Sequence, residues 1–139
     1  MNSTMDIQDE DSSAREDVLS NEIIGAAIEV HRCLGPGLLE SAYEECLCHE
    51  LTDRGVKFER QKSLPIPYKG KILDCGYRLD VVVAGLVVLE LKAVDRLEPI
   101  HTAQMLTYLK LSQLKLGMLI NFNVPSLRSG IKRVVNNLR

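Results

Sequence analysis

Two apolar stretches on either side of the dipeptide Ala84-Gly85 constrain the fold of this chain more than any other feature. Residues 79–83 and 87–91 are apolar at nearly every position, and so short a connection is typical of a β-hairpin. Because neither stretch shows the alternation of a half-exposed strand, both are predicted to be central strands. The chain length of 139 residues corresponds to one domain built around them.

The N-terminal part of the chain is predicted to contain a disordered tail followed by two helices. Residues 1–19 are polar and lack apolar periodicity, so we expect a disordered acidic tail before a domain over residues 20–139. Ser20 can cap a helix that stops at Gly35-Pro36-Gly37, and a second helix is predicted over residues 39–54.

After Gly55 the hydrophobic period changes to two, which predicts strands. The first three strands should pair antiparallel in sequence order, and a helix should then cross over to a fourth strand parallel to the third. The expected strands are residues 56–68, 71–83, 86–93 and 116–122, and the expected helices are residues 100–114 and 126–138. The prediction is an α/β fold with a mixed four-stranded sheet flanked by helices.

Three charged residues are embedded in the central strands. Glu90 and Lys92 share one face of their strand because side chains alternate with a period of two, and Asp80 interrupts the preceding strand. A three-residue turn over residues 84–86 would place Asp80 opposite Glu90, so that the three side chains converge. A two-residue turn would pair Asp80 with Leu89 and direct it away from Glu90.

Two converging carboxylates beside a lysine suit Mg²⁺ or Mn²⁺, which take oxygen ligands and can activate water for phosphodiester hydrolysis. The alternative is a structural ion pair at a sheet end, formed by Lys92 with Asp80 or Glu90. A buried charge needs a partner in either case. The residues alone leave both interpretations open.

Two further sets of polar residues share helix faces. His101, Gln104 and Tyr108 recur at spacings of three and four, so they could contact a phosphate or the metal site, or simply face solvent. Glu40 and Glu44 lie on one face near the start of the second helix, where a carboxylate is also favoured by the helix dipole.

The charge distribution is consistent with a polyanionic partner, although the net charge is only -2. Residues 1–22 carry a net charge of -6, and the remainder of the chain carries +4. No acidic residue occurs after Glu98. The basic residues predicted to bind nucleic acid are Lys110, Lys115, Arg128, Lys132 and Arg133. A solvated basic face is the alternative.

Membrane insertion and secretion are not expected. No run approaches the roughly 18 apolar residues of a membrane span, and the N-terminal residues are acidic where a secretory signal is basic and then apolar. The prediction is a cytoplasmic protein.

Three motifs resemble those of a known family. The segment Gly37-Leu38-Leu39-Glu40-Ser41-Ala42-Tyr43 matches the signature of the GxxExxY proteins. Asp80 with Glu90-Leu91-Lys92 is similar to the core of the PD-(D/E)XK nuclease superfamily, and Gln104-Met105-Leu106-Thr107-Tyr108 matches its QxxxY element. The chain therefore resembles the GxxExxY family of that superfamily over about residues 19–138.

The resemblance implies a restriction-endonuclease-like core of order α-β-β-β-α-β, here with an extra N-terminal and an extra C-terminal helix. It implies that Asp80, Glu90 and Glu40 hold the metal, with Glu44 as the competitor for the place of Glu40. It also implies that Lys92 orients or activates the water.

Gln104 and Tyr108 would support the site or the scissile strand. The expected function is a Mg²⁺- or Mn²⁺-dependent nuclease acting on DNA, or alternatively RNA. Because the chain is small, a homodimer or a protein partner would be needed to enclose a duplex. The rival interpretation is an inactive module with the nuclease fold that binds nucleic acid or a protein partner.

Overall fold

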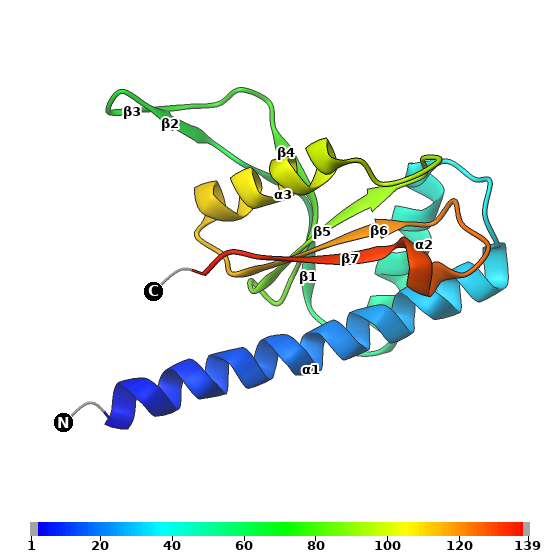
Figure 1. Ribbon diagram of the computed structural model, residues 1–139, viewed down its shortest axis with the longest axis horizontal. Helices are drawn as coiled ribbons and strands as arrows, with labels where there is room; N and C mark the ends of the chain where they lie inside the picture. Colours follow the sequence, from blue (N-terminus) through cyan, green and yellow to red (C-terminus); the bar gives the residue numbers. More distant parts are fainter. Residues whose placement is uncertain (1–2, 138–139) are drawn as a thin grey trace.

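A computed structural model describes residues 3–137, with side chains from Ala14 onward. Helices and strands alternate around one main sheet (Figure 1). The helices are α1 (Ser3–Leu34), α2 (Glu40–Asp53), α3 (Pro99–Ser112) and the short 3₁₀ helix η1 (Leu127–Gly130). The strands are β1 (Phe58–Ser63), β2 (Ile66–Tyr68), β3 (Lys71–Leu73), β4 (Arg78–Val83), β5 (Val87–Lys92), β6 (Leu116–Asn121) and β7 (Ile131–Val135).

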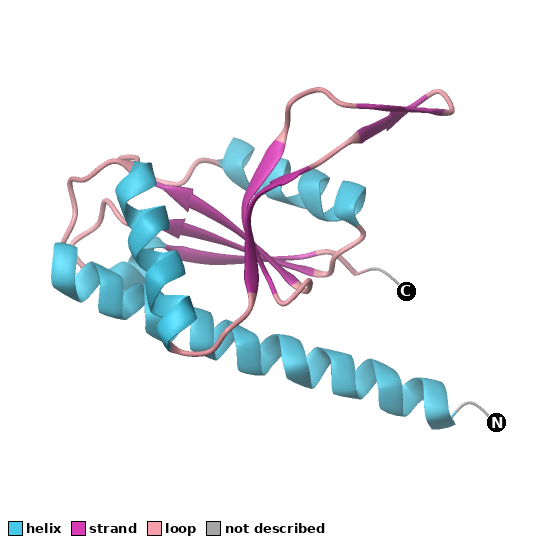
Figure 2. Ribbon diagram, turned by 180° about the vertical axis from the view of Figure 1, so that it is seen from behind, coloured by secondary structure: helices cyan, strands magenta, loops and turns pink. Residues whose placement is uncertain are grey.

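The main sheet has the strand order β1-β4-β5-β6-β7, and only the β5–β6 pair is parallel. This confirms the predicted antiparallel strands followed by a helical crossover. The first two predicted strands are each divided in two, because β2 and β3 form a separate hairpin that extends from the sheet (Figure 2). Pro65, which has no N–H to donate, lies in the break between β1 and β2.

Helices cover both faces of the sheet: α1 and α2 pack on one face, and α3 packs on the other (Figures 1 and 2). The first layer includes Tyr43 of α2, whose ring stacks on Phe122 at a centroid distance of 4.4 Å. In the second layer, Met105 and Leu109 of α3 pack against Val88 of β5. Burial on both faces explains why β5 and β6 are apolar without alternation.

The β4–β5 hairpin has the register on which the predicted site depends. Val83 pairs with Val87 and Val81 with Leu89, so the turn contains three residues, 84–86. Continuing this pairing by one residue beyond Val81 and Leu89 places Asp80 opposite Glu90. Ala84 and Gly85 both have positive φ values, 52° and 66°. The turn therefore decides the face on which Asp80 lies.

The predicted C-terminal helix over residues 126–138 is wrong in the described range. Its place is taken by η1 and by β7, which pairs antiparallel with β6. Residues 131–135 contain three β-branched residues, Ile131, Val134 and Val135, which favour a strand. This strand also pairs the backbone of β6, which would otherwise be a long apolar sheet edge. The sheet consequently has five strands rather than four.

The predicted helix start at Ser20 is also wrong, because α1 continues back to Ser3. From Ala14 on, this segment contacts the rest of the protein: Glu16 is buried, Leu19 packs against the core, and Asp17 forms an ion pair with Arg133. Tertiary contacts therefore support the helix from about Glu16, ahead of the predicted start at Ser20. Within the described residues, no helix is both long enough and apolar enough to span a membrane.

Candidate active site

Asp80 and Glu90 meet where strands β4 and β5 separate. The Asp80 N–H donates a 2.9 Å hydrogen bond to Oε2 of Glu90, and the Leu91 N–H donates a 2.9 Å bond to Oδ2 of Asp80. Each carboxylate thus binds the backbone of the opposite strand. Glu90 is only 7% exposed, and Asp80 is half-buried. The structure brings together the two acids that the sequence predicted to converge.

The two acids are poorly solvated and repel each other. Burial, followed by the charge of Asp80, raises the pKa of Glu90 to about 8. Burial also raises the pKa of Asp80, although the hydrogen bond from Leu91 opposes this effect. A positive charge held between the two carboxylates would relieve both the burial cost and the repulsion.

Lys92 lies two residues after Glu90 on β5, so the two side chains share a face of the sheet. Its positive charge lowers the pKa of both Asp80 and Glu90, in opposition to the effect of burial. With the residues that the structure describes, Lys92 forms no ion pair within 4.0 Å. It lies near the acids without neutralising either one by direct contact.

Glu40 and Glu44, the two candidates on α2, occupy different environments. Glu40 is the first residue of α2, is exposed, and accepts a 3.4 Å hydrogen bond from the Ala93 N–H, just past the end of β5. Glu44 is buried and fully engaged: it accepts bonds of 3.0 and 3.2 Å from Arg60 and one of 2.8 Å from Gln61. The geometry therefore leaves Glu40 as the freer acid beside the site.

Two of the three polar residues predicted on the crossover helix can serve the site. Tyr108 is half-buried, and its pKa is raised by burial and then by the negative charge of Glu90. Gln104, one turn earlier on α3, is exposed. His101 has a structural role, because its Nδ1 accepts a 2.9 Å bond from the Glu98 N–H in a capping box.

The predicted nucleic-acid-binding residues are not gathered beside the acids. Lys110 lies near the C-terminal end of α3, and Lys115 precedes Leu116, which pairs with Val87 at the start of β5. That end of β5 is about 16 Å from Lys92 at the usual rise of a strand. The others lie along the C-terminal segment, where Arg128 is in η1 and Lys132 and Arg133 are in β7.

Asn121 is a buried residue of the site region that sequence reasoning missed. It is 1% exposed, pairs with Lys92 across the β5–β6 register, and binds the loop after β5 through its side chain. Its Nδ2 donates to the Val94 carbonyl at 2.9 Å, and its Oδ1 accepts from the N–H groups of Val94 and Asn123 at 3.1 and 3.2 Å. An amide inside an otherwise apolar strand was the available signal.

Arg60 and Gln61, which hold Glu44, were also missed. Gln61 has a positive φ of 49° in β1 and interrupts the paired positions between Arg60 and Lys62. This backbone irregularity has no signature in the sequence. It lies where β1 runs beside Asp80.

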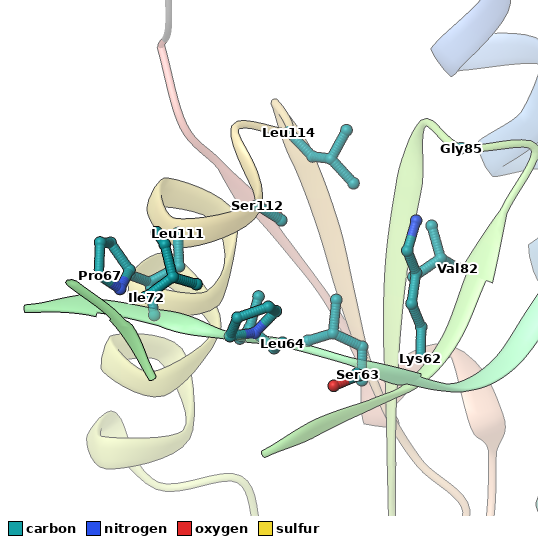
Figure 3. A pocket seen from close by; sticks show the side chains of 12 residues that line it. Lys62, Ser63, Leu64, Pro67, Ile72, Val82, Gly85, Leu111, Ser112 and Leu114 are labelled. Atoms are coloured by element: carbon teal, nitrogen blue, oxygen red, sulfur yellow. The ribbon is translucent and has the colours of Figure 1, made fainter. Parts of the chain in front are cut away.

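A cavity lies away from the acids, between the β2–β3 hairpin and the C-terminal end of α3 (Figure 3). It has a volume of about 340 Å³ and a mainly apolar lining that includes Leu64, Pro67, Ile72 and Leu111. None of the predicted catalytic residues lines it. The candidate active site is therefore distinct from this cavity.

The donor set fits a hard divalent cation. In the described part of the chain, no three His, Cys, Asp or Glu side chains form a group that could hold a metal ion by themselves. Asp80 and Glu90 nevertheless supply two neighbouring carboxylates, and Mg²⁺ often binds one or two carboxylates while water and substrate phosphate oxygens complete its shell. Glu40, as positioned, remains bound to the backbone of Ala93.

The mixed sheet with helices on both faces, and paired acids at the separation of two central strands, define a restriction-endonuclease-like fold. The family model described as the PD-(D/E)XK nuclease superfamily matches residues 17–134. The chain belongs to this superfamily. No curated protein and no solved structure gives a significant match to the chain.

Proposed function

We propose that this protein is a metal-dependent nuclease that hydrolyses phosphodiester bonds of DNA, with RNA as the alternative substrate. The observation that carries the proposal is the reciprocal contact of Asp80 and Glu90 with each other's strands, beside Lys92. Membership of the nuclease superfamily supports a nucleic-acid substrate. Burial raises the pKa of both acids, and the charge of Asp80 raises that of Glu90 further, which supports a bound cation.

Asp80 and Glu90 are proposed to hold Mg²⁺ or Mn²⁺. When bound, such an ion lowers the pKa of water and offsets charge on the phosphate. Lys92 is proposed to orient the attacking water, since its ammonium group lies on the same face as Glu90. Glu40 is the further acid proposed for the cation, and Gln104 and Tyr108 would support the scissile strand from α3.

Binding of the nucleic-acid backbone is proposed for Arg128, Lys132, Arg133, Lys110 and Lys115. These residues are distributed along three elements and a loop rather than clustered at the acids. A homodimer or a protein partner would enlarge the surface that faces a duplex. Basic side chains of this kind bind phosphates and do not distinguish between base sequences.

Calorimetry with Mg²⁺ and Mn²⁺, combined with cleavage assays on single-stranded and duplex DNA, tests the proposal. Wild type should bind the cation and cleave DNA, whereas Asp80→Asn should do neither. Asp95→Asn is the matched control, because it removes the same charge from an exposed loop position just after β5. Cation binding and cleavage that persist in Asp80→Asn would overturn the proposed roles.

The competing function is an inactive nuclease fold that binds nucleic acid or a protein partner. In its favour, both carboxylates already accept backbone hydrogen bonds, so they can serve as structural caps of the separating strands. An inactive fold predicts that the wild-type protein binds neither Mg²⁺ nor Mn²⁺. It also predicts that Asp80→Asn is less stable than the wild type. The same calorimetry, with thermal unfolding of both proteins, distinguishes the two functions.

A further inference from the structure

Tyr77 is an aromatic side chain near the acids that the proposed mechanism does not use. It is 49% exposed and lies just before β4, three residues ahead of Asp80. Three residues of extended chain span about 10 Å. About half of the Tyr77 side chain is therefore open to solvent near the proposed catalytic carboxylate.

The Tyr77 ring is held in place. Its backbone carbonyl accepts a 2.9 Å hydrogen bond from the Leu64 N–H, which closes the base of the β2–β3 hairpin. Its ring lies 6.3 Å from the ring of Tyr108, with an angle of 55° between the ring planes. The two rings are tilted rather than stacked, and Tyr77 is still 49% exposed, so part of its ring remains open to solvent.

The chain segments that flank Tyr77 are basic. Arg78 follows it and is exposed, and Lys62, Lys69 and Lys71 are exposed on β1 and the hairpin. Between residues 62 and 78 the only acid is Asp74. A fixed, half-exposed aromatic ring among cations is the combination that binds unpaired nucleotides, since the ring stacks on a base and the cations bind phosphates.

We propose that Tyr77 stacks on a base of single-stranded DNA beside the scissile phosphate, so that the preferred substrate is an unpaired strand. This inference rests on the proposed nuclease function and names its substrate class. A base within a duplex is stacked on its neighbours and cannot present its face to Tyr77. The contribution of Tyr77 is therefore confined to single strands and frayed ends.

Fluorescence anisotropy of a labelled oligothymidine and of a matched duplex tests the inference. EDTA prevents cleavage during the measurement. Stacking on one aromatic residue corresponds to a loss of about tenfold or more in affinity when it is removed. We expect this loss for the single strand with Tyr77→Leu, no loss with Tyr77→Phe, and unchanged affinity for the duplex.

Tyr68→Leu is the matched control. Tyr68 is 58% exposed on the same hairpin, but Nζ of Lys69 lies 5.4 Å from its ring centroid, so this face is already occupied. This variant should bind the single strand like wild type. A strand containing 2-aminopurine should show base stacking as fluorescence quenching with wild type and not with Tyr77→Leu.

The outcomes separate this inference from the nuclease proposal. Equal single-strand affinity of wild type and Tyr77→Leu overturns the stacking role, even if Asp80→Asn abolishes cleavage. An equal loss with Tyr68→Leu, or no binding of the single strand by wild type, overturns it as well. A loss specific to Tyr77→Leu in a protein that cleaves nothing supports the stacking role and contradicts the nuclease proposal.

Discussion

Glu90 combines near-complete burial with a negative neighbour, and both effects favour its neutral form. Its pKa in the folded protein is raised to about 8 from an ordinary value of 4.5. The folded state therefore binds a proton that the unfolded state releases. Stability contributed by that proton is fully present below pH 4.5 and is lost as the pH rises towards 8.

We expect Glu90→Gln, which cannot ionise, to remove most of this pH dependence. In EDTA, wild type should lose stability between pH 5 and pH 8.5 by on the order of a few kcal/mol more than the variant does. Thermal unfolding at both pH values measures the difference. Glu59→Gln, at an exposed position of β1, should follow the wild-type curve. Parallel curves for wild type and Glu90→Gln would contradict the expectation.

Asn121 links the end of β6 to the loop that follows Lys92 through two hydrogen bonds with Val94, and it accepts a third from the N–H of Asn123. Asn121→Ala leaves the N–H and carbonyl of Val94 without these partners in a half-buried loop. We expect the free energy of unfolding to fall by about 2–4 kcal/mol. Urea denaturation measures the change. Asn123→Ala, which loses only a 3.5 Å contact with the same carbonyl, should cost much less.

In the β6–η1–β7 unit, Gly130 packs so closely against Asn121 and Val124 that there is no room for a side chain. A Cβ at this position would lie against the Asn121 carbonyl and within 3.0 Å of Val124 Cγ2. Gly130→Ala should therefore displace the start of β7 and destabilise the protein by about 1–3 kcal/mol. Denaturant unfolding tests this, with exposed Ser129→Ala as the neighbouring control. Equal stability of Gly130→Ala and wild type would show that the unit adjusts freely.

The elements that can be predicted from the sequence are those whose local pattern of apolar and turn residues matches the contacts that they make in the folded protein. Continuous apolar stretches and turn residues predicted the β4–β5 hairpin, and its three-residue turn is the alternative that places Asp80 opposite Glu90. Residues 131–135 could not be predicted in this way, because their strand forms only by pairing with β6. The positive φ of Gln61 likewise depends on contacts made after folding, here the bond to Glu44.

The molecule as a whole separates acidic from basic charge. Residues 1–22 carry a net charge of -6, and α1 extends beyond the body of the protein at its N-terminal end (Figure 1). From α1, Asp17 pairs with Arg133 of β7 at 3.5 Å, and Glu22 pairs with Arg54 at the end of α2 at 3.3 Å. The first of these pairs engages a residue that we propose contacts DNA. The N-terminal acids should therefore compete with a polyanion at short and at long range.

Neutralising four acidic residues before Ala14 tests the long-range competition with a polyanion without changing the chain length. The variant replaces Asp6, Asp9 and Asp11 with Asn and Glu10 with Gln. Charges interact over about 30 Å at 0.01 M salt and over about 8 Å at 0.15 M. We expect the variant to bind DNA severalfold more tightly than wild type at low salt and equally at physiological salt, as measured by anisotropy. Asp17→Asn should raise affinity at both salt concentrations, because it frees Arg133 by direct contact. If the fourfold variant and wild type bind alike at low salt, the acidic segment does not screen the basic body.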